Sequence, residues 1–207
     1  MNISFKYSTQ LKFSKLLQHV NKVVKACYMA IQQLSSIKSF LSTTNMNTLI
    51  VICTKVFSQL DYCNCLYFGI SASSIKKLQR VQNAAARLVK YTPHSMLVDV
   101  FTKYHWLKVN ERILFKLLLT VHKCLRGKAP QYVSSVLVTG AERTGKLLET
   151  KVNSRYGERA FSHAGPKVWN VLPLYIRSEV NTVKFKKLLK SFLITNELTF
   201  SQELNTQ

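Results

Sequence analysis

The chain has 207 residues, and 30 lysines and arginines against 9 aspartates and glutamates give it a formal net charge of +21. This excess points to a polyanionic partner, with nucleic acid first and an anionic membrane surface second. Hydrophobic residues make up 47% of the chain, which argues against wholesale disorder, while the low counts of six glycines and four prolines argue against a turn-rich β-sandwich and for long helices.

The N-terminal part of the chain predicts two helices. Apolar residues at spacings of three and four predict a helix over residues 14–41. Thr43 or Thr44 can cap a second helix, whose apolar residues lie in 49–57. Residues 61–68 are expected to form a compact, aromatic segment, and Gly69 is expected to end it.

The middle of the chain predicts a further long helix and a short one. Ser71 or Ser73 can begin a helix that runs to about Lys90. The Thr92-Pro93 step ends it, because the residue before proline is pushed out of the α region. A short helix is expected at about 95–101.

A second long helix and a loop follow. Asn110 can cap a helix over 111–126, and Gly127 is its expected C-terminal stop. Pro130 opens a short helix. Residues 138–156 lose the apolar periodicity, so they are predicted to form a loop or mobile linker.

The last part of the chain predicts two helices. One spans 161–172 and is expected to break near Gly165-Pro166. Asn181 or Thr182 can cap the other, which ends at about Ile194.

These elements together predict an all-α protein, an irregular bundle of about seven helices with a smaller C-terminal helical segment. The expected division is a helical domain at 1–137, the linker at 138–156, a C-terminal helical segment at 157–197 and a frayed tail at 198–207.

The titratable residues argue against an enzyme. Only two aspartates occur, Asp61 and Asp99, whereas a two-metal polymerase or nuclease needs several carboxylates that converge on Mg²⁺. The five cysteines, of which Cys63-x-Cys65 is the only close pair, match neither a disulfide framework nor a zinc site. We therefore expect no catalytic residues, no metal and no cofactor, and an intracellular setting, nuclear or cytoplasmic. No run reaches the ~18 apolar residues of a membrane span, so no membrane partner is expected.

Two of the predicted helices carry a row of cations without any acid between them. The first basic stripe consists of Lys76, Arg80, Arg87 and Lys90, in line with Asn83. The second basic stripe consists of Arg112, Lys116, Lys123 and Arg126, with Leu119 interrupting it. A solvated outer face is the alternative, but such a face usually mixes both signs of charge. Because phosphate would relieve the repulsion between these cations, both stripes are predicted to contact a nucleic-acid backbone.

A series of short sequence motifs occurs in a fixed order through residues 11–194. They include Leu60-Asp61-Tyr62-Cys63-Asn64, Leu78-Gln79-Arg80-Val81-Gln82-Asn83-Ala84-Ala85-Ala86-Arg87, His105-Trp106-Leu107, Ala129-Pro130-Gln131-Tyr132-Val133, Tyr156-Gly157-Glu158-Arg159-Ala160-Phe161 and Trp169-Asn170. The series resembles the region downstream of the reverse-transcriptase palm in jockey-like and chicken-repeat-like LINE (non-LTR) retrotransposons. Gln59 and Lys108 depart from the arginine and proline that this family usually carries there.

The resemblance implies a thumb-like domain over 1–137 and a chain that starts just past the palm. In that family the palm carries the catalytic aspartates, and the thumb holds the template–primer duplex. The expected function is therefore that of a non-catalytic fragment of an RNA-directed DNA polymerase. Its expected partners are RNA, an RNA–DNA hybrid or DNA, together with the palm and fingers of the parent polymerase. The alternatives are an inert, decayed retrotransposon remnant and an independent basic structural RNA-binding protein.

Overall fold

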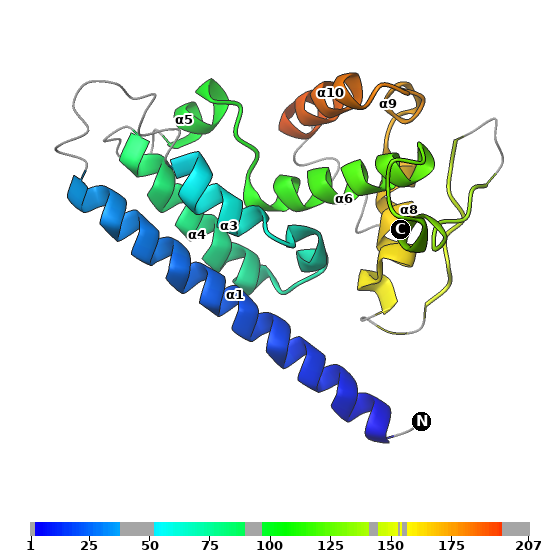
Figure 1. The fold of residues 1–207 in the computed structure, drawn as a ribbon, viewed down its shortest axis with the longest axis horizontal. Coiled ribbons are helices and arrows are strands. Elements are labelled where there is room, and N and C mark those ends of the chain that lie inside the picture. The colour runs from blue at the N-terminus through cyan, green and yellow to red at the C-terminus, as the bar shows by residue number, and fades with distance from the viewer. Residues whose placement is uncertain are drawn as a thin grey trace. The chain divides into compact units, whose positions relative to one another are not determined.

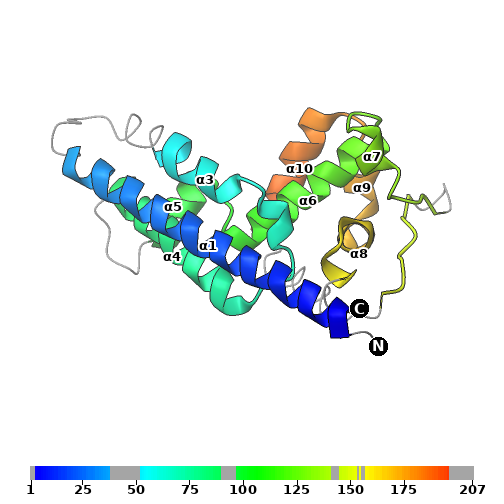
Figure 2. The ribbon, with the colours of Figure 1, turned by 60° about the horizontal axis from the view of Figure 1, so that its bottom comes forward.

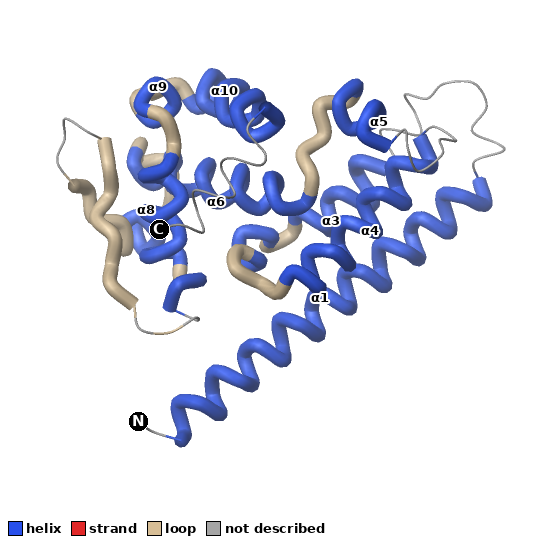
Figure 3. Tube along the Cα trace, turned by 180° about the vertical axis from the view of Figure 1, so that it is seen from behind, coloured by secondary structure: helices blue, strands red, loops and turns tan. Residues whose placement is uncertain are grey.

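The computed structural model describes residues 3–37, 52–89, 97–140, 145–152, 154 and 157–195 (Figure 1). Within these ranges the regular elements are helices (Figure 3), and the one β-bridge pairs Thr139 with Leu147. The all-α prediction is confirmed. Nine α-helices lie in the described ranges, and three of them are single turns of four residues. None of these helices combines the length and hydropathy that crossing a bilayer requires.

The chain divides into two compact units. Unit 1 comprises Met1–Cys63 and Ile70–Val109, and unit 2 comprises Asn64–Gly69 and Asn110–Gln207. This division differs from the predicted one at 138–156. Residues 110–137 belong with the C-terminal helices because their long helix shares a core with them, as described below.

Unit 1 is built around two long helices that lie side by side. Its elements are α1 (Ile3–Ile37), the π-helix η1 (Cys53–Phe57), α3 (Ser58–Asp61), α4 (Ala72–Val89) and α5 (Leu97–Lys103). α1 packs along α4, and η1 with α3 packs against α1 (Figures 1 and 2). Their facing apolar side chains form the core, among them the fully buried Cys27, Val56, Val81 and Ala85.

The observed starts of α1 and α4 can be compared with the starts that the sequence pattern predicts. α1 begins at Ile3 rather than at residue 14, because a helix once nucleated extends by one hydrogen bond per residue without needing a packed face. Thr43 and Thr44, the predicted caps, lie outside the described residues. At the start of α4, the Ser71 hydroxyl oxygen and carbonyl both accept from the Ser74 N–H, at 3.4 and 2.9 Å. Ser71, rather than Ser73, is therefore the cap.

The predicted cap of the helix after residue 110 is wrong. α6 spans Val109–Leu125, so Asn110 lies inside it. The first N–H of this helix, that of Val109, donates to Gln79 Oε1 at 2.9 Å. A side chain from α4 therefore does what a local cap was expected to do.

Unit 2 surrounds α6 with short helices. They are η2 (Asn64–Tyr67), α7 (Gln131–Ser134), η5 (Gly157–Arg159), α8 (Phe161–Val171), α9 (Leu174–Arg177) and α10 (Thr182–Thr195). His122 of α6 stacks on Phe185 of α10, with ring centroids 4.1 Å apart, and Phe185 stacks on Trp169 of α8 at 5.9 Å. This shared core joins α6 to the C-terminal helices.

Part of the segment that was predicted to be a loop or mobile linker, residues 145–150, is bound to α8. The Trp169 indole N–H donates to the Gly145 carbonyl at 3.0 Å, and the Asn170 amide exchanges two 2.9 Å hydrogen bonds with the Leu147 backbone. Asn170 also donates to Glu149 Oε1 at 2.8 Å. Leu147 is buried as a result. These residues form a loop, as predicted, and side-chain amides rather than apolar periodicity hold that loop against α8.

The expected break at Gly165-Pro166 is also wrong. α8 continues through Pro166. Proline has no N–H, so it deprives the Ser162 carbonyl of its usual helical donor. The Thr150 hydroxyl donates to that carbonyl at 3.4 Å instead. The segment attached to α8 thus compensates for the proline inside it.

Arg159 fastens residues 64–69 to unit 2. Its Nε donates to the Phe68 carbonyl at 3.0 Å, and its Nη2 donates to the Leu66 carbonyl at 3.3 Å. Gly69 has a φ of +70°, and a Cβ there would lie 2.9 Å from Arg159 Cγ. Gly69 therefore provides both the left-handed turn and the room that Arg159 needs.

Replacing Gly69 with alanine tests whether the contact between Arg159 and residues 66–69, called the Arg159 clasp below, stabilises the fold. We expect a loss of about 1–2 kcal/mol in the free energy of unfolding from the left-handed φ alone, plus the cost of displacing Arg159. Gly127→Ala is the matched control, because Gly127 has a φ of +63° but nothing within 4 Å of the added Cβ. Denaturant unfolding should show a larger loss for Gly69→Ala, and equal losses would contradict the Arg159 clasp.

Candidate nucleic-acid interface

The first basic stripe lies on the outer face of α4 in unit 1. Lys76 and Arg80 are exposed and Arg87 is half-buried, whereas the side chains on the opposite face, such as Leu78 and Val81, are buried. Lys90 lies outside the described residues. The predicted split of this helix into an apolar face and a cationic face is therefore observed for the three described members.

No described residue pairs with these three cations. The sequence of α4 contains no acid, and neither a hydrogen bond nor an ion pair joins Lys76, Arg80 or Arg87 to another described side chain. Lys76 and Arg80 are four residues apart, a spacing at which like charges destabilise a helix by about 0.2–0.5 kcal/mol. An external anion would remove that repulsion.

The rotation of α4 is fixed by two glutamines that flank Arg80. Gln82 is fully buried and donates through Nε2 to the Leu107 carbonyl at 2.8 Å. Gln79 accepts from the Val109 N–H and donates through Nε2 to Asn83 Oδ1 at 2.9 Å. These hydrogen bonds keep the first basic stripe on the side of α4 that faces away from the core of unit 1. Neither glutamine was predicted as a structural residue, and their spacing of three at the edge of the apolar face is the only sign of them in the sequence.

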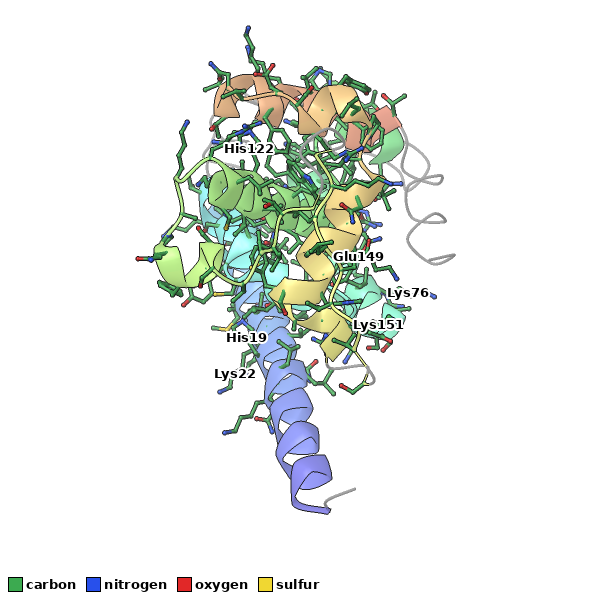
Figure 4. The ribbon with its side chains drawn as sticks, turned by 90° about the vertical axis from the view of Figure 1, so that its right-hand side faces the viewer. His19, Lys22, Lys76, His122, Glu149 and Lys151 are labelled. Carbon is green, nitrogen blue, oxygen red and sulfur yellow. The ribbon has the colours of Figure 1, made fainter. Side chains whose placement is uncertain are left out.

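Two other cations of unit 1, Lys77 and Lys22, point away from the first basic stripe. Lys77 of α4 turns toward α1, where its Nζ donates to Asn21 Oδ1 at 3.1 Å. Lys15 and Lys22 of α1 are exposed. Figure 4 shows Lys22 projecting on the opposite side of α1 from Lys76. Lys22 therefore does not extend the first basic stripe.

The second basic stripe belongs to unit 2 and is less uniform. Lys116 is exposed, while Arg112, Lys123 and Arg126 are half-buried and Leu119 between them is buried. Arg126 already donates through Nη2 to the Glu179 carbonyl at 3.3 Å. Part of this stripe therefore serves the packing of unit 2, and within it only Lys116 is exposed as Lys76 and Arg80 of α4 are.

The surroundings of the Cys27 thiol and the placement of possible metal ligands bear on thiol and metal chemistry. Cys27 donates to Gln59 Oε1 at 3.3 Å, and burial raises the pKa of its thiol to about 11, so the thiol stays protonated at neutral pH. The described part of the chain contains no group of three His, Cys, Asp or Glu side chains that could hold a metal ion.

No protein family matches this chain, and no curated protein or solved structure is similar to it. The resemblance to the post-palm region of LINE reverse transcriptases therefore stays a prediction, which rests on the short sequence motifs described above.

Proposed function

We propose that this chain is a non-catalytic module that binds the backbone of RNA or of an RNA–DNA hybrid, with the first basic stripe as its main contact. The observation that carries the proposal is the outer face of α4. There, Lys76, Arg80 and Arg87 follow one line, and no described side chain neutralises them. The resemblance to a polymerase thumb region, which grips template–primer, supports the same partner.

The chemistry of these side chains suits phosphate. Each guanidinium offers several N–H donors in a fixed plane, which match the oxygens of a phosphodiester. Contacts of this kind position a protein on a nucleic acid without reading its sequence. The second basic stripe would add a separate contact through Lys116 and Lys123, and the palm and fingers of a parent polymerase would supply the catalytic carboxylates.

The binding should depend strongly on salt and little on sequence. Each phosphate that the protein neutralises contributes about −0.9 to the slope of log K against log salt on duplex DNA. We expect hybrid probes of different sequence to bind alike at a given salt concentration. A marked preference for one sequence, or affinity that salt does not reduce, would contradict backbone binding.

Replacing Arg80 and Arg87 together with glutamine should flatten this slope by about one to two units. The fold should survive, because both side chains lie away from the buried face of α4. Fluorescence anisotropy with an RNA–DNA hybrid across a salt series gives the slope, and circular dichroism checks the helix content. An unchanged slope in a folded variant would remove α4 from the interface and would favour a protein without nucleic-acid contact there.

A further inference from the structure

One histidine of unit 2 is buried in an unusual polar environment. The side chain of His122, which is labelled in Figure 4, is fully buried, and its Nε2 lies 3.0 Å from the Glu179 carbonyl oxygen. A carbonyl oxygen can only accept, so Nε2 carries the hydrogen of this bond. The other nitrogen, Nδ1, is buried and has no hydrogen-bond partner among the described residues.

The same ring is a packing surface for α10. It stacks on Phe185 at 4.1 Å with an interplanar angle of 20°, and Phe185 is itself fully buried. His122 therefore holds the C-terminal helices in two ways. Its N–H binds the turn between α9 and α10, and its face supports the main apolar anchor of α10.

Burial and two neighbouring cations disfavour protonation of the ring. Burial lowers the pKa of His122 first, and the cations Arg126 and Lys128 lower it further, while the hydrogen bond to Glu179 and its carboxylate oppose them. Arg126 donates to the same Glu179 carbonyl, and Lys128 donates to Thr182 Oγ1 at 3.2 Å. Glu179 Oε1 is engaged by the Asn181 N–H at 2.7 Å.

From this geometry we infer that His122 is a pH-sensitive latch, whose protonation in mild acid releases the α9–α10 segment from α6. A proton on Nδ1 would create a buried donor without an acceptor and a cation inside an aromatic stack beside Arg126. Opening the contact would expose the ring to water. The chain would thus carry a conformational response to acid that is separate from the proposed binding of nucleic acid.

The direction of the effect follows from proton linkage. The pKa of His122 in the folded chain lies below its ordinary value of about 6.5, so the opened state binds more protons between those two values. The stabilisation from the closed latch is complete above about pH 6.5 and decreases as the pH falls below it. For one proton, the opening equilibrium constant rises by at most about tenfold per pH unit.

Hydrogen exchange on the full chain between pH 7.5 and 5 tests the latch. After correction for the intrinsic exchange rate, opening of the α10 amides should increase by up to about tenfold per pH unit below pH 6.5. The amides of α4 in unit 1 serve as the internal reference and should not follow this trend. Flat opening of α10 over the whole range would overturn the inference.

Two substitutions assign the effect to His122. Glutamine can still donate to the Glu179 carbonyl, and phenylalanine can still stack on Phe185, but neither side chain titrates. Both His122→Gln and His122→Phe should therefore remove the pH dependence of α10 opening. His163→Gln is the control, because His163 is the other described histidine of unit 2 and bonds the Thr150 carbonyl at 2.7 Å. His163→Gln should keep the pH dependence of the parent chain. If the inference is right, both His122 variants should lose it.

A direct titration covers the case in which both His122 variants fail to fold. The His122 ring resonances of the parent chain, followed by NMR across the same pH range, should titrate below pH 6.5 together with the change in α10. Titration at or above pH 6.5 would overturn the latch whatever the variants do.

Discussion

Replacing Trp169 with alanine should lower the free energy of unfolding of unit 2 by about 3–5 kcal/mol. Trp169 is one of the largest fully buried side chains, and it packs against Phe185. Its indole N–H also binds the Gly145 carbonyl, so the substitution removes one of the hydrogen bonds that hold the segment at 145–150. The loss comes mainly from the large cavity, and the lost hydrogen bond to the Gly145 carbonyl adds to it.

Hydrogen exchange measures this loss where it occurs. The amides of α8 and α10 should exchange much faster in Trp169→Ala than in the parent. Trp106→Ala is a suitable comparison, because Trp106 packs edge-on against Phe57 and Phe101 in unit 1. That variant should expose amides of unit 1 first. Unchanged protection of α8 in Trp169→Ala would show that the aromatic core does not hold unit 2 together.

Replacing Val81 with aspartate should destabilise unit 1 by several kcal/mol, because the carboxylate would be buried without a partner. Val81 is fully buried on α4, on the face opposite the first basic stripe. The neighbouring substitution, Arg80→Asp, changes the charge by two rather than one, but Arg80 is exposed. We expect it to change the stability by less than about 1 kcal/mol while weakening nucleic-acid binding.

The pair of variants separates the two faces of one helix. Denaturant unfolding should report the loss in Val81→Asp, and binding to an RNA–DNA hybrid should report the loss in Arg80→Asp. Similar destabilisation by both substitutions would mean that the cationic side of α4 is also packed in the folded protein, and the proposed interface would then be wrong.

Local signals in the sequence predicted most of the helices, because their causes are local. The Asn181 side chain accepts from the Val183 and Lys184 N–H groups at 2.8 and 3.2 Å, as a helix cap should. Gly127 adopts the left-handed φ of +63° that was expected of a C-terminal stop. Each of these features depends on residues within one helical turn.

The missed features depend on side chains that bind backbone far away in the sequence. Gln79 reaches the Val109 N–H, Asn170 reaches the Leu147 backbone, and Arg159 reaches the Phe68 carbonyl. A polar residue at the edge of an apolar face gives no periodic signal of which distant amide it will bind. For the same reason, the sequence could place cations on α4 but could not show that Arg126 is partly engaged by Glu179.

The most direct test of the proposed interface compares two double variants of equal charge. Arg80→Gln with Arg87→Gln removes two cations from the first basic stripe. Lys15→Gln with Lys22→Gln removes two exposed cations from α1 in the same unit. On an RNA–DNA hybrid, the first pair should flatten the slope of log K against log salt by about one to two units, and the second pair should change it little. Equal slopes for the two variants would mean that only the net charge matters, and would contradict a binding site on α4.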